Sequence, residues 1–109
     1  MMITQEEARS ICLSMPEIEE GCYRRPDFRV RGRIFAGHYP GTQYFDLKVG
    51  LEEQYMLSTE RNKFSLPRTG RNAGWITVHI AAIELKEFEE LVWKAWRYTA
   101  PPRLSLRYS

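Results

Sequence analysis

The chain has 109 residues, of which 43% are hydrophobic and 28% charged, and its net charge is +2. This length suits a single domain with its own core, and this balance of residues excludes an intrinsically disordered chain. Cys12 and Cys22 form neither a disulfide framework nor a CxxC motif, and no apolar run approaches the roughly 18 residues that a membrane span needs. The N-terminal residues also lack the pattern of a secretory signal. We therefore expect a cytoplasmic protein without a membrane partner, acting as a monomer.

The first predicted element is a helix that begins at the capping box Thr4-Gln5-Glu6-Glu7, where two side chains each accept a backbone amide. Its apolar residues follow at the spacing of one helix face: Ala8, Ile11, Cys12 and Met15. Pro16 ends the helix, because the residue before a proline is disfavoured in the α region. We expect Cys12 to be a small core residue, and Ile18 to reach the core from a loop that closes at Gly21.

A hairpin between residues 26 and 36 is expected to organise the sheet. Phe28 and Val30 alternate with arginines, which is the period-2 pattern of a half-buried strand. The dipeptide Arg31-Gly32 suits a two-residue turn, since glycine adopts positive φ without strain. The register that such a turn predicts pairs Phe28 with Phe35 and Arg29 with Ile34. One face of the hairpin is then apolar, and the other carries arginine.

The same patterns predict further elements along the chain. Alternating residues indicate strands at 44–49 and 74–80, and helices are expected at 51–59 and 84–99. Residues 61–73 contain a proline, a glycine and four positive charges, and we interpret them as a long surface loop.

Together these elements predict an α+β fold with two layers. An antiparallel sheet of four to five strands carries the N- and C-terminal helices on one face, because that face collects the apolar side chains. Residues 1–102 are expected to form one domain and residues 103–109 a C-terminal tail. The expected core comprises Phe28, Val30, Phe35, Leu47, Ile76, Val78, Phe88 and Trp96. The opposite face would show Arg29, Arg31, His38, Tyr44, Lys48, Trp75, Thr77 and His79.

The cationic side chains are concentrated in three segments, although the net charge is only +2. Residues 22–40 and 61–72 each carry a net charge of +4, and residues 97–109 carry +3. Such clusters are typical of polyanion-binding surfaces, and an aromatic side chain among them could stack on an unpaired base. The candidate nucleic-acid contacts are Arg24, Arg25, Arg29, Arg31, Arg33, Lys48, Arg68, Arg71 and Trp75. A solvated surface of mixed charge is the alternative interpretation of the same pattern.

Two functions remain open, and neither involves catalysis. One is weak, sequence-tolerant DNA binding, and the other is docking of another protein on the open, aromatic sheet face. His79 beside Asp46 is the one acid–base pair predicted on that face, and no nucleophile or phosphate-loop motif accompanies it. The cysteines and histidines also lack the spacing of zinc ligands. We therefore expect no enzymatic activity, no metal and no cofactor.

Several blocks, in sequence order, resemble the YjbR/MmcQ family. They are Met15-Pro16 with Glu19-Glu20, residues 26–36 around Phe28-Arg29-Val30, Leu47-Lys48, Gly74-Trp75 and Ala100-Pro101. The chain departs from the usual pattern at Met15 and Arg33, where the family usually has leucine and lysine. The resemblance implies a fold similar to that of bacterial frataxin and a DNA-binding role of the type called double wing. It carries over no catalytic residue.

Overall fold

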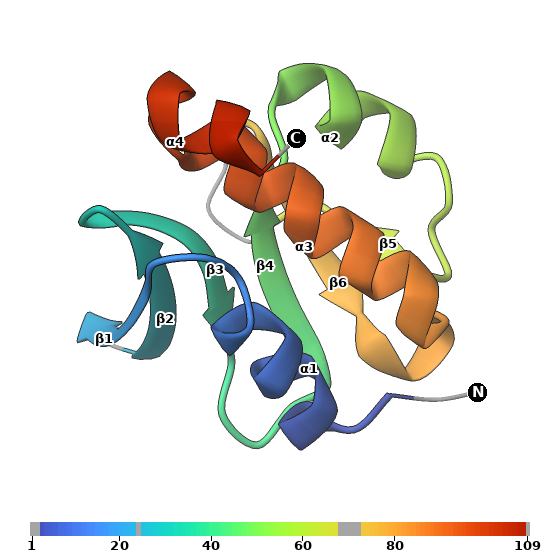
Figure 1. Cartoon of the computed structure of the whole chain (residues 1–109). Helices are drawn as coiled ribbons and strands as arrows, with labels where there is room; N and C mark the ends of the chain where they lie inside the picture. The colour runs from blue at the N-terminus through green and yellow to red at the C-terminus, as the bar shows by residue number, and fades with distance from the viewer. Residues whose placement is uncertain (1–2, 24, 68–72, 109) are drawn as a thin grey trace.

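Within the described residues, 3–23, 25–67 and 73–108, six strands form one antiparallel sheet, and helices cover one of its faces (Figure 1). The computed structural model therefore has the α+β architecture expected from the sequence. The strands are β1 (Ile18–Tyr23), β2 (Arg25–Val30), β3 (Arg33–His38), β4 (Tyr44–Lys48), β5 (Phe64–Ser65) and β6 (Trp75–His79). The helices are α1 (Gln5–Leu13), α2 (Leu51–Leu57), α3 (Leu85–Thr99) and α4 (Pro102–Arg107), with a short 3-10 turn at Ile80–Ala82.

The strand order is β1-β2-β3-β4-β6-β5, a meander in which only the last two strands exchange places. The sheet has more strands than expected because a strand begins at Ile18, within the loop predicted to close at Gly21, and another lies within the loop predicted at 61–73. Residues 18–23 form β1 on one edge, and two residues of the 61–73 segment form β5 on the other. Neither segment shows an apolar alternation, since β1 contains Glu19-Glu20-Gly21 and β5 is only two residues long.

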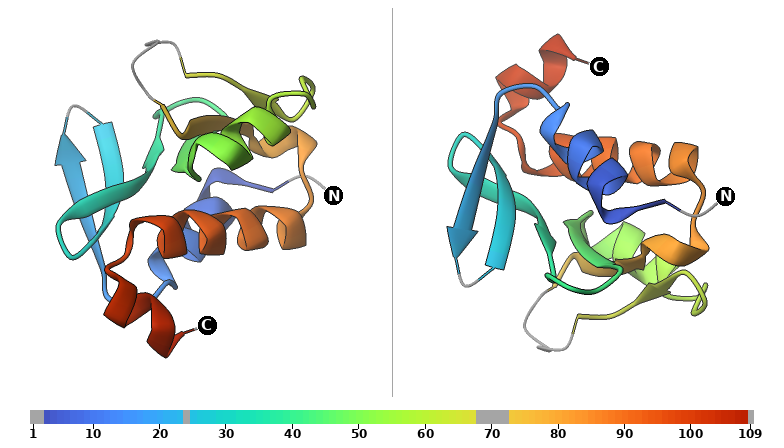
Figure 2. Two further views of the ribbon diagram at one scale, coloured as in Figure 1. Left: turned by 90° about the horizontal axis from the view of Figure 1, so that it is seen from above. Right: turned by 90° about the horizontal axis from the view of Figure 1, so that it is seen from below.

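The first and third helices lie on the same face of the sheet, as predicted. α1 packs against α3 and β1, while α3 packs across β3 and β4, and Figure 2 shows α1 and α3 side by side. The predicted capping box is formed. Thr4 Oγ1 accepts from the Glu7 amide at 3.1 Å, and Glu7 Oε1 accepts from the Thr4 amide at 3.0 Å. The short helix α2 packs against β6.

The turn between β2 and β3 has the predicted backbone. Arg31 and Gly32 both adopt positive φ, at 51° and 80°. Positive φ at both central residues is the mark of a type I′ turn, whose twist matches that of the flanking strands. Arg29 lies opposite Ile34, which confirms the register next to the turn.

A β-bulge changes the register further from the turn. Phe28 lies opposite Ala36 and not opposite Phe35 as predicted, because Phe35 is the extra residue of β3. Beyond the bulge the side chains of β3 exchange faces. His38 consequently lies on the core side, where its ring stacks on that of Phe45 at a centroid distance of 4.4 Å. The prediction that His38 faces away from the helices was therefore wrong.

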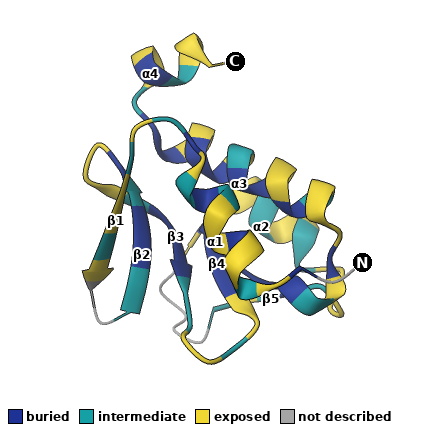
Figure 3. Ribbon diagram, turned by 60° about the horizontal axis from the view of Figure 1, so that its bottom comes forward, coloured by how far each residue is buried: buried dark blue, intermediate teal, exposed yellow. Residues whose placement is uncertain are grey.

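The predicted core is confirmed. Phe28 is 1% exposed, and the other seven predicted core residues are fully buried. Figure 3 shows the buried residues along β2 and β3 and on parts of α1 and α3. Cys12 is also buried in the core, as predicted, and its burial raises the pKa of the thiol. Cys12 is therefore an unreactive packing residue.

We expect Phe28→Ala to lower the free energy of unfolding by about 3–5 kcal/mol, because loss of a buried phenyl ring removes packing and leaves a cavity. Urea denaturation followed by circular dichroism measures this change. Tyr55, which is 78% exposed on α2, provides the control. Its truncation to alanine should change the unfolding free energy by less than about 0.5 kcal/mol. A similarly small loss in Phe28→Ala would contradict the placement of Phe28.

Candidate anion-binding cleft and polar sheet face

The sheet face opposite the helices, which we call the open face, carries a row of small and polar residues. In the strand register the row runs Gly21, Asp27, Gly37, Asp46, Thr77 and Ser65. Asp27 and Asp46 are 4% and 1% exposed, although no helix covers them. A buried carboxylate costs free energy unless it is paired and hydrogen-bonded. The two aspartates of the row therefore need cations and hydrogen-bond donors around them.

Three donors satisfy Asp46. Arg25 Nη2 and the Tyr39 hydroxyl donate to Oδ2 at 2.9 and 2.8 Å, and the Thr77 hydroxyl donates to Oδ1 at 2.6 Å. The Arg25 guanidinium also lies over the Tyr39 ring, 4.0 Å from its centroid. The other terminal nitrogen of Arg25, Nη1, is buried without a hydrogen-bond partner in the described part of the chain. Arg25 therefore acts as the counter-ion of Asp46.

Arg29 has the same relation to Asp27. Its Nε and Nη2 donate to the two carboxylate oxygens at 2.8 and 3.2 Å, and this hydrogen bonding raises the pKa of Arg29. Two glycines make room for the pairs. A Cβ at Gly21 would lie 2.7 Å from Asp27 Oδ1, and a Cβ at Gly37 would lie 2.6 Å from Arg25 Nη1. A larger residue at either position would displace an ion pair.

At the β5 end of the row, the open face forms a hollow of about 440 Å³. It is lined by Tyr39, Thr42, Tyr44, Ser65, Leu66, Thr77 and His79. His79 Nε2 lies 3.0 Å from Ser65 Oγ, and the His79 ring lies 4.9 Å from the Tyr44 ring. The partner of His79 is thus Ser65 and not Asp46, so the predicted acid–base pair of His79 with Asp46 is not formed.

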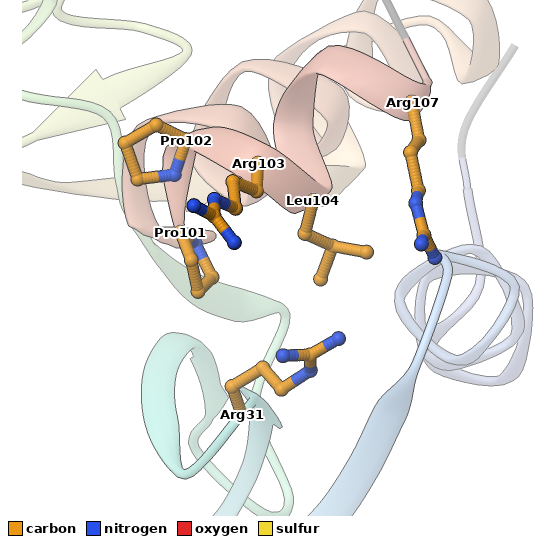
Figure 4. A pocket seen from close by; sticks show the side chains of 6 residues that line it. All are labelled: Arg31, Pro101, Pro102, Arg103, Leu104 and Arg107. Carbon is orange, nitrogen blue, oxygen red and sulfur yellow. The ribbon is translucent and has the colours of Figure 1, made fainter.

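A larger cleft of about 620 Å³ lies between the β2–β3 turn and α4. Its lining comprises Arg31, Pro101, Pro102, Arg103, Leu104 and Arg107. Figure 4 shows Arg31 extending from the turn toward Leu104, with Arg103 and Arg107 on the α4 side. Leu104 is buried and anchors α4. The cleft therefore places three guanidinium groups from two distant segments around an apolar centre.

Glu17 pairs with Arg31 beside this cleft. Arg31 Nε and Nη2 donate to its oxygens at 2.6 and 3.2 Å. These hydrogen bonds, together with the charges of Arg31 and Arg107, lower the pKa of Glu17, and the same pair raises the pKa of Arg31. Because the folded pKa of Glu17 is depressed, the pair stabilises the fold above the pKa of an unfolded glutamate. That stabilisation is lost as the pH falls through the folded value.

Arg103 and Arg107 differ from the arginines of the open face. Both side chains belong to exposed residues of α4, and neither forms an ion pair with a carboxylate of the described residues. They are therefore the cations of the cleft that can accept an external anion without breaking a close ion pair, although the charge of Arg107 also acts on Glu17.

Antiparallel pairing brings further cations to the same end of the sheet. Lys48 ends β4 and lies opposite Trp75, which begins β6. Because β3 and β4 are antiparallel, β3 begins where β4 ends, so Arg33 and the β2–β3 turn also lie at this end. Arg33 is exposed, whereas Lys48 and Trp75 are half-buried. We call this region, with the cleft, the basic end.

The expected nucleic-acid contacts thus divide into three groups. Arg25 and Arg29 are held by buried aspartates on the open face. Arg31, Arg33, Lys48 and Trp75 lie at the basic end. Arg24, Arg68 and Arg71 lie outside the described residues. The structure therefore brings together four of the expected contacts and gives two others a structural partner.

Arg103 and Arg107 were not among the individually named contacts, although the last segment was counted as one of the three basic clusters and was expected to be a tail. That segment contains α4, which begins at Pro102. A proline at the first position of a helix is a start signal, so Pro101-Pro102 could have indicated this helix. The burial of Asp27 and Asp46 had no comparable signal, since an aspartate that alternates with apolar residues normally faces solvent.

The described residues offer little to two other classes of site. Between residues 3–23, 25–67 and 73–108, no group of three or more histidine, cysteine, aspartate or glutamate side chains is placed to hold a metal ion. None of the helices in these ranges combines the length and the apolar character that crossing a membrane requires.

Comparison with known proteins places the chain in a family. The structure is similar to the crystal structure of the Deinococcus radiodurans protein DR2400, which contains a domain described as DUF419. The TM-score is 0.77 at 19% sequence identity, and the match covers 89% of this chain and 78% of that chain. At this identity the likeness shows the fold alone. No curated protein matches the chain significantly. The family model described as YjbR matches residues 13–98, most of the sequence, and the chain therefore belongs to the YjbR family.

Proposed function

We propose that this protein binds nucleic acid through its basic end, weakly and without strong sequence preference. The observation that carries the proposal is the convergence of Arg31, Arg103 and Arg107 around one cleft of about 620 Å³. Guanidinium groups donate in a planar fork that suits phosphate oxygens. Contacts of this kind position a phosphate backbone and require no catalytic step.

The spread of the cations favours a chain of phosphates over a single bound anion. Beyond the cleft, Arg33 and Lys48 continue the positive charge along the end of the sheet. A protein that follows a nucleic-acid backbone needs such a track, because each contact neutralises one phosphate and releases its counterions. Trp75, beside Lys48, could stack on a base if the bound strand is single. Contacts to the backbone alone carry no sequence information.

The double variant Arg103→Ala with Arg107→Ala should weaken binding to labelled single- and double-stranded oligonucleotides. The loss should be similar for unrelated sequences, and the slope of log affinity against log salt concentration should fall by roughly one for each removed contact. Titration at two or more salt concentrations measures both effects. Both side chains belong to exposed residues that form no ion pair within the described part of the chain, so the fold should be preserved.

The matched control is Arg61→Ala with Lys86→Ala, which removes the same charge from exposed positions outside the basic end. It should leave the salt slope unchanged. Arg29 is unsuitable for this test, because its loss would remove a hydrogen-bonded counter-ion from the buried Asp27. Affinity weaker than about 10⁻⁴ M at low salt would lie below ordinary non-specific binding and would contradict the proposal. Docking of a polypeptide on the open face would then be the favoured function.

Glu17→Gln should strengthen oligonucleotide binding, because it removes the carboxylate that competes with phosphate for Arg31. The neutral amide keeps the size of the side chain. Most of the gain should disappear when Arg31→Ala is added, because Arg31 holds the Glu17 carboxylate by hydrogen bonds, whereas Arg107 interacts with its charge alone. Affinity measured at one low salt concentration is sufficient for this comparison.

Glu20→Gln is the control for Glu17→Gln. Glu20 forms an equally exposed, two-pronged pair with Arg9, whose Nη2 lies 2.7 Å from Glu20 Oε1. The substitution changes the net charge by the same amount away from the cleft. Equal gains in the two variants would show a general effect of charge and would count against Arg31 as a phosphate contact.

A further inference from the structure

The hollow on the open face lies at the opposite end of β3 from the cleft and has a different chemistry. Its volume of about 440 Å³ falls within the range of small-molecule sites. Hydroxyl groups from Thr77 and Ser65 lie next to each other in the strand register, and aromatic and aliphatic side chains surround them. A concave surface with apolar walls and a few convergent polar groups is the usual form of a ligand site.

The direction of one hydrogen bond determines whether Thr77 offers a donor or an acceptor to the hollow. A carboxylate accepts only, so the Thr77 hydroxyl must give its single proton to Asp46 Oδ1, at 2.6 Å. The Thr77 oxygen is left with lone pairs alone. Thr77 lines the hollow and is 7% exposed, so a ligand group that reaches its oxygen there can only donate a hydrogen bond to it. The buried ion pair beneath it prevents the hydroxyl from rotating to serve as a donor.

The neighbouring hydroxyl can complement this acceptor. Ser65 Oγ and His79 Nε2 are 3.0 Å apart, and either atom can supply the proton between them. When the imidazole donates, the hydroxyl proton of Ser65 is free to point into the hollow. The polar surface then presents an acceptor at Thr77 beside a donor at Ser65.

The walls suit a flat ring. Tyr44 is 44% exposed, and its ring contacts that of His79. Leu66, at the other side of the lining, is 60% exposed. An aromatic face left open beside polar groups is the arrangement on which heteroaromatic rings stack.

We propose that this hollow binds a flat heteroaromatic ring that carries an amino group beside a ring nitrogen, the edge that adenine and cytosine present. The amino group donates to Thr77, the ring nitrogen accepts from Ser65, and the ring stacks on Tyr44. The site does not depend on the basic end, because none of these residues lines the cleft. A ring with a carbonyl in place of the amino group, as in hypoxanthine or uracil, would place the lone pairs of its oxygen against those of Thr77. Two acceptors form no hydrogen bond.

The test is a titration of the full chain with adenosine and with inosine, followed by NMR chemical shifts. Adenosine should shift the resonances of Thr77, Ser65, His79 and Tyr44 and should bind about three- to tenfold more tightly than inosine, the effect of one hydrogen bond at an accessible site. Cytidine should be preferred over uridine in the same way. Equal affinities, shifts confined to other surfaces, or no shift at about 10 mM adenosine would each overturn the proposal.

Variants identify the group that discriminates. Thr77→Ser keeps the hydroxyl and should keep the preference, whereas Thr77→Val should reduce adenosine binding to the level of inosine. Thr59→Val is the control, since the Thr59 hydroxyl donates to Met56 O on the surface. If Thr77→Val fails to fold, the comparison of the two nucleosides on the unaltered protein still decides the matter.

The source of the base is distinguished by a second pair of ligands. Single-stranded oligonucleotides that differ only by adenine or hypoxanthine at every base are titrated into wild-type protein and into Arg103→Ala with Arg107→Ala. A preference for adenine over hypoxanthine that persists in the double variant and with free nucleosides supports a site for a free base or nucleoside. Discrimination seen only with the oligonucleotide and lost in the double variant would overturn an independent site.

Discussion

The ion pair between Asp46 and Arg25 sets the character of the open face. Asp46 is 1% exposed, and breaking a buried pair by removing one partner typically costs about 3–5 kcal/mol. The 29% exposure of the Arg25 side chain places this pair toward the lower end of that range. The pair requires Gly37 beneath the guanidinium and Tyr39 over it. An arginine held in this way stabilises the sheet. It cannot move to a phosphate without the free-energy cost of leaving Asp46 buried and without its counter-ion.

The pair between Glu17 and Arg31 has the opposite property. Its two side chains are 38% and 53% exposed, and ion pairs in such surroundings contribute little to stability. An external anion can therefore replace the carboxylate at small cost. The difference between a buried and an exposed pair distinguishes arginines that stabilise the fold from arginines proposed to bind an anion. The proposed nucleic-acid contacts therefore lie at the basic end. Arg103 and Arg107, at the same end, form no ion pair among the described residues.

Periodicity and turn chemistry predicted most of the fold, because both are local. The capping box at Thr4 and the Arg31-Gly32 turn each depend on neighbouring residues alone. The bulge at Phe35 could not be predicted in this way. An extra residue leaves every local preference intact and changes only the face of the sheet on which the following side chains lie. Charge counting identified three basic segments but could not show which of their arginines were already paired. Whether an arginine is paired depends on which carboxylates the strand register places near it. Here the register sets Asp46 opposite Gly37.

The two proposed sites have complementary chemistry at the two ends of β3. The basic end offers donors to an anion, and the hollow offers the fixed lone pairs of Thr77 to a donor. β3 has six residues, so its ends are roughly 20 Å apart at about 3.3 Å per residue. Substitutions separated by that distance normally act additively. With separate ligands, variants of Arg103 should therefore leave nucleoside affinity unchanged and variants of Thr77 should leave oligonucleotide affinity unchanged. Losses of affinity for one oligonucleotide in both variants, combining additively, would instead indicate one strand that occupies both ends.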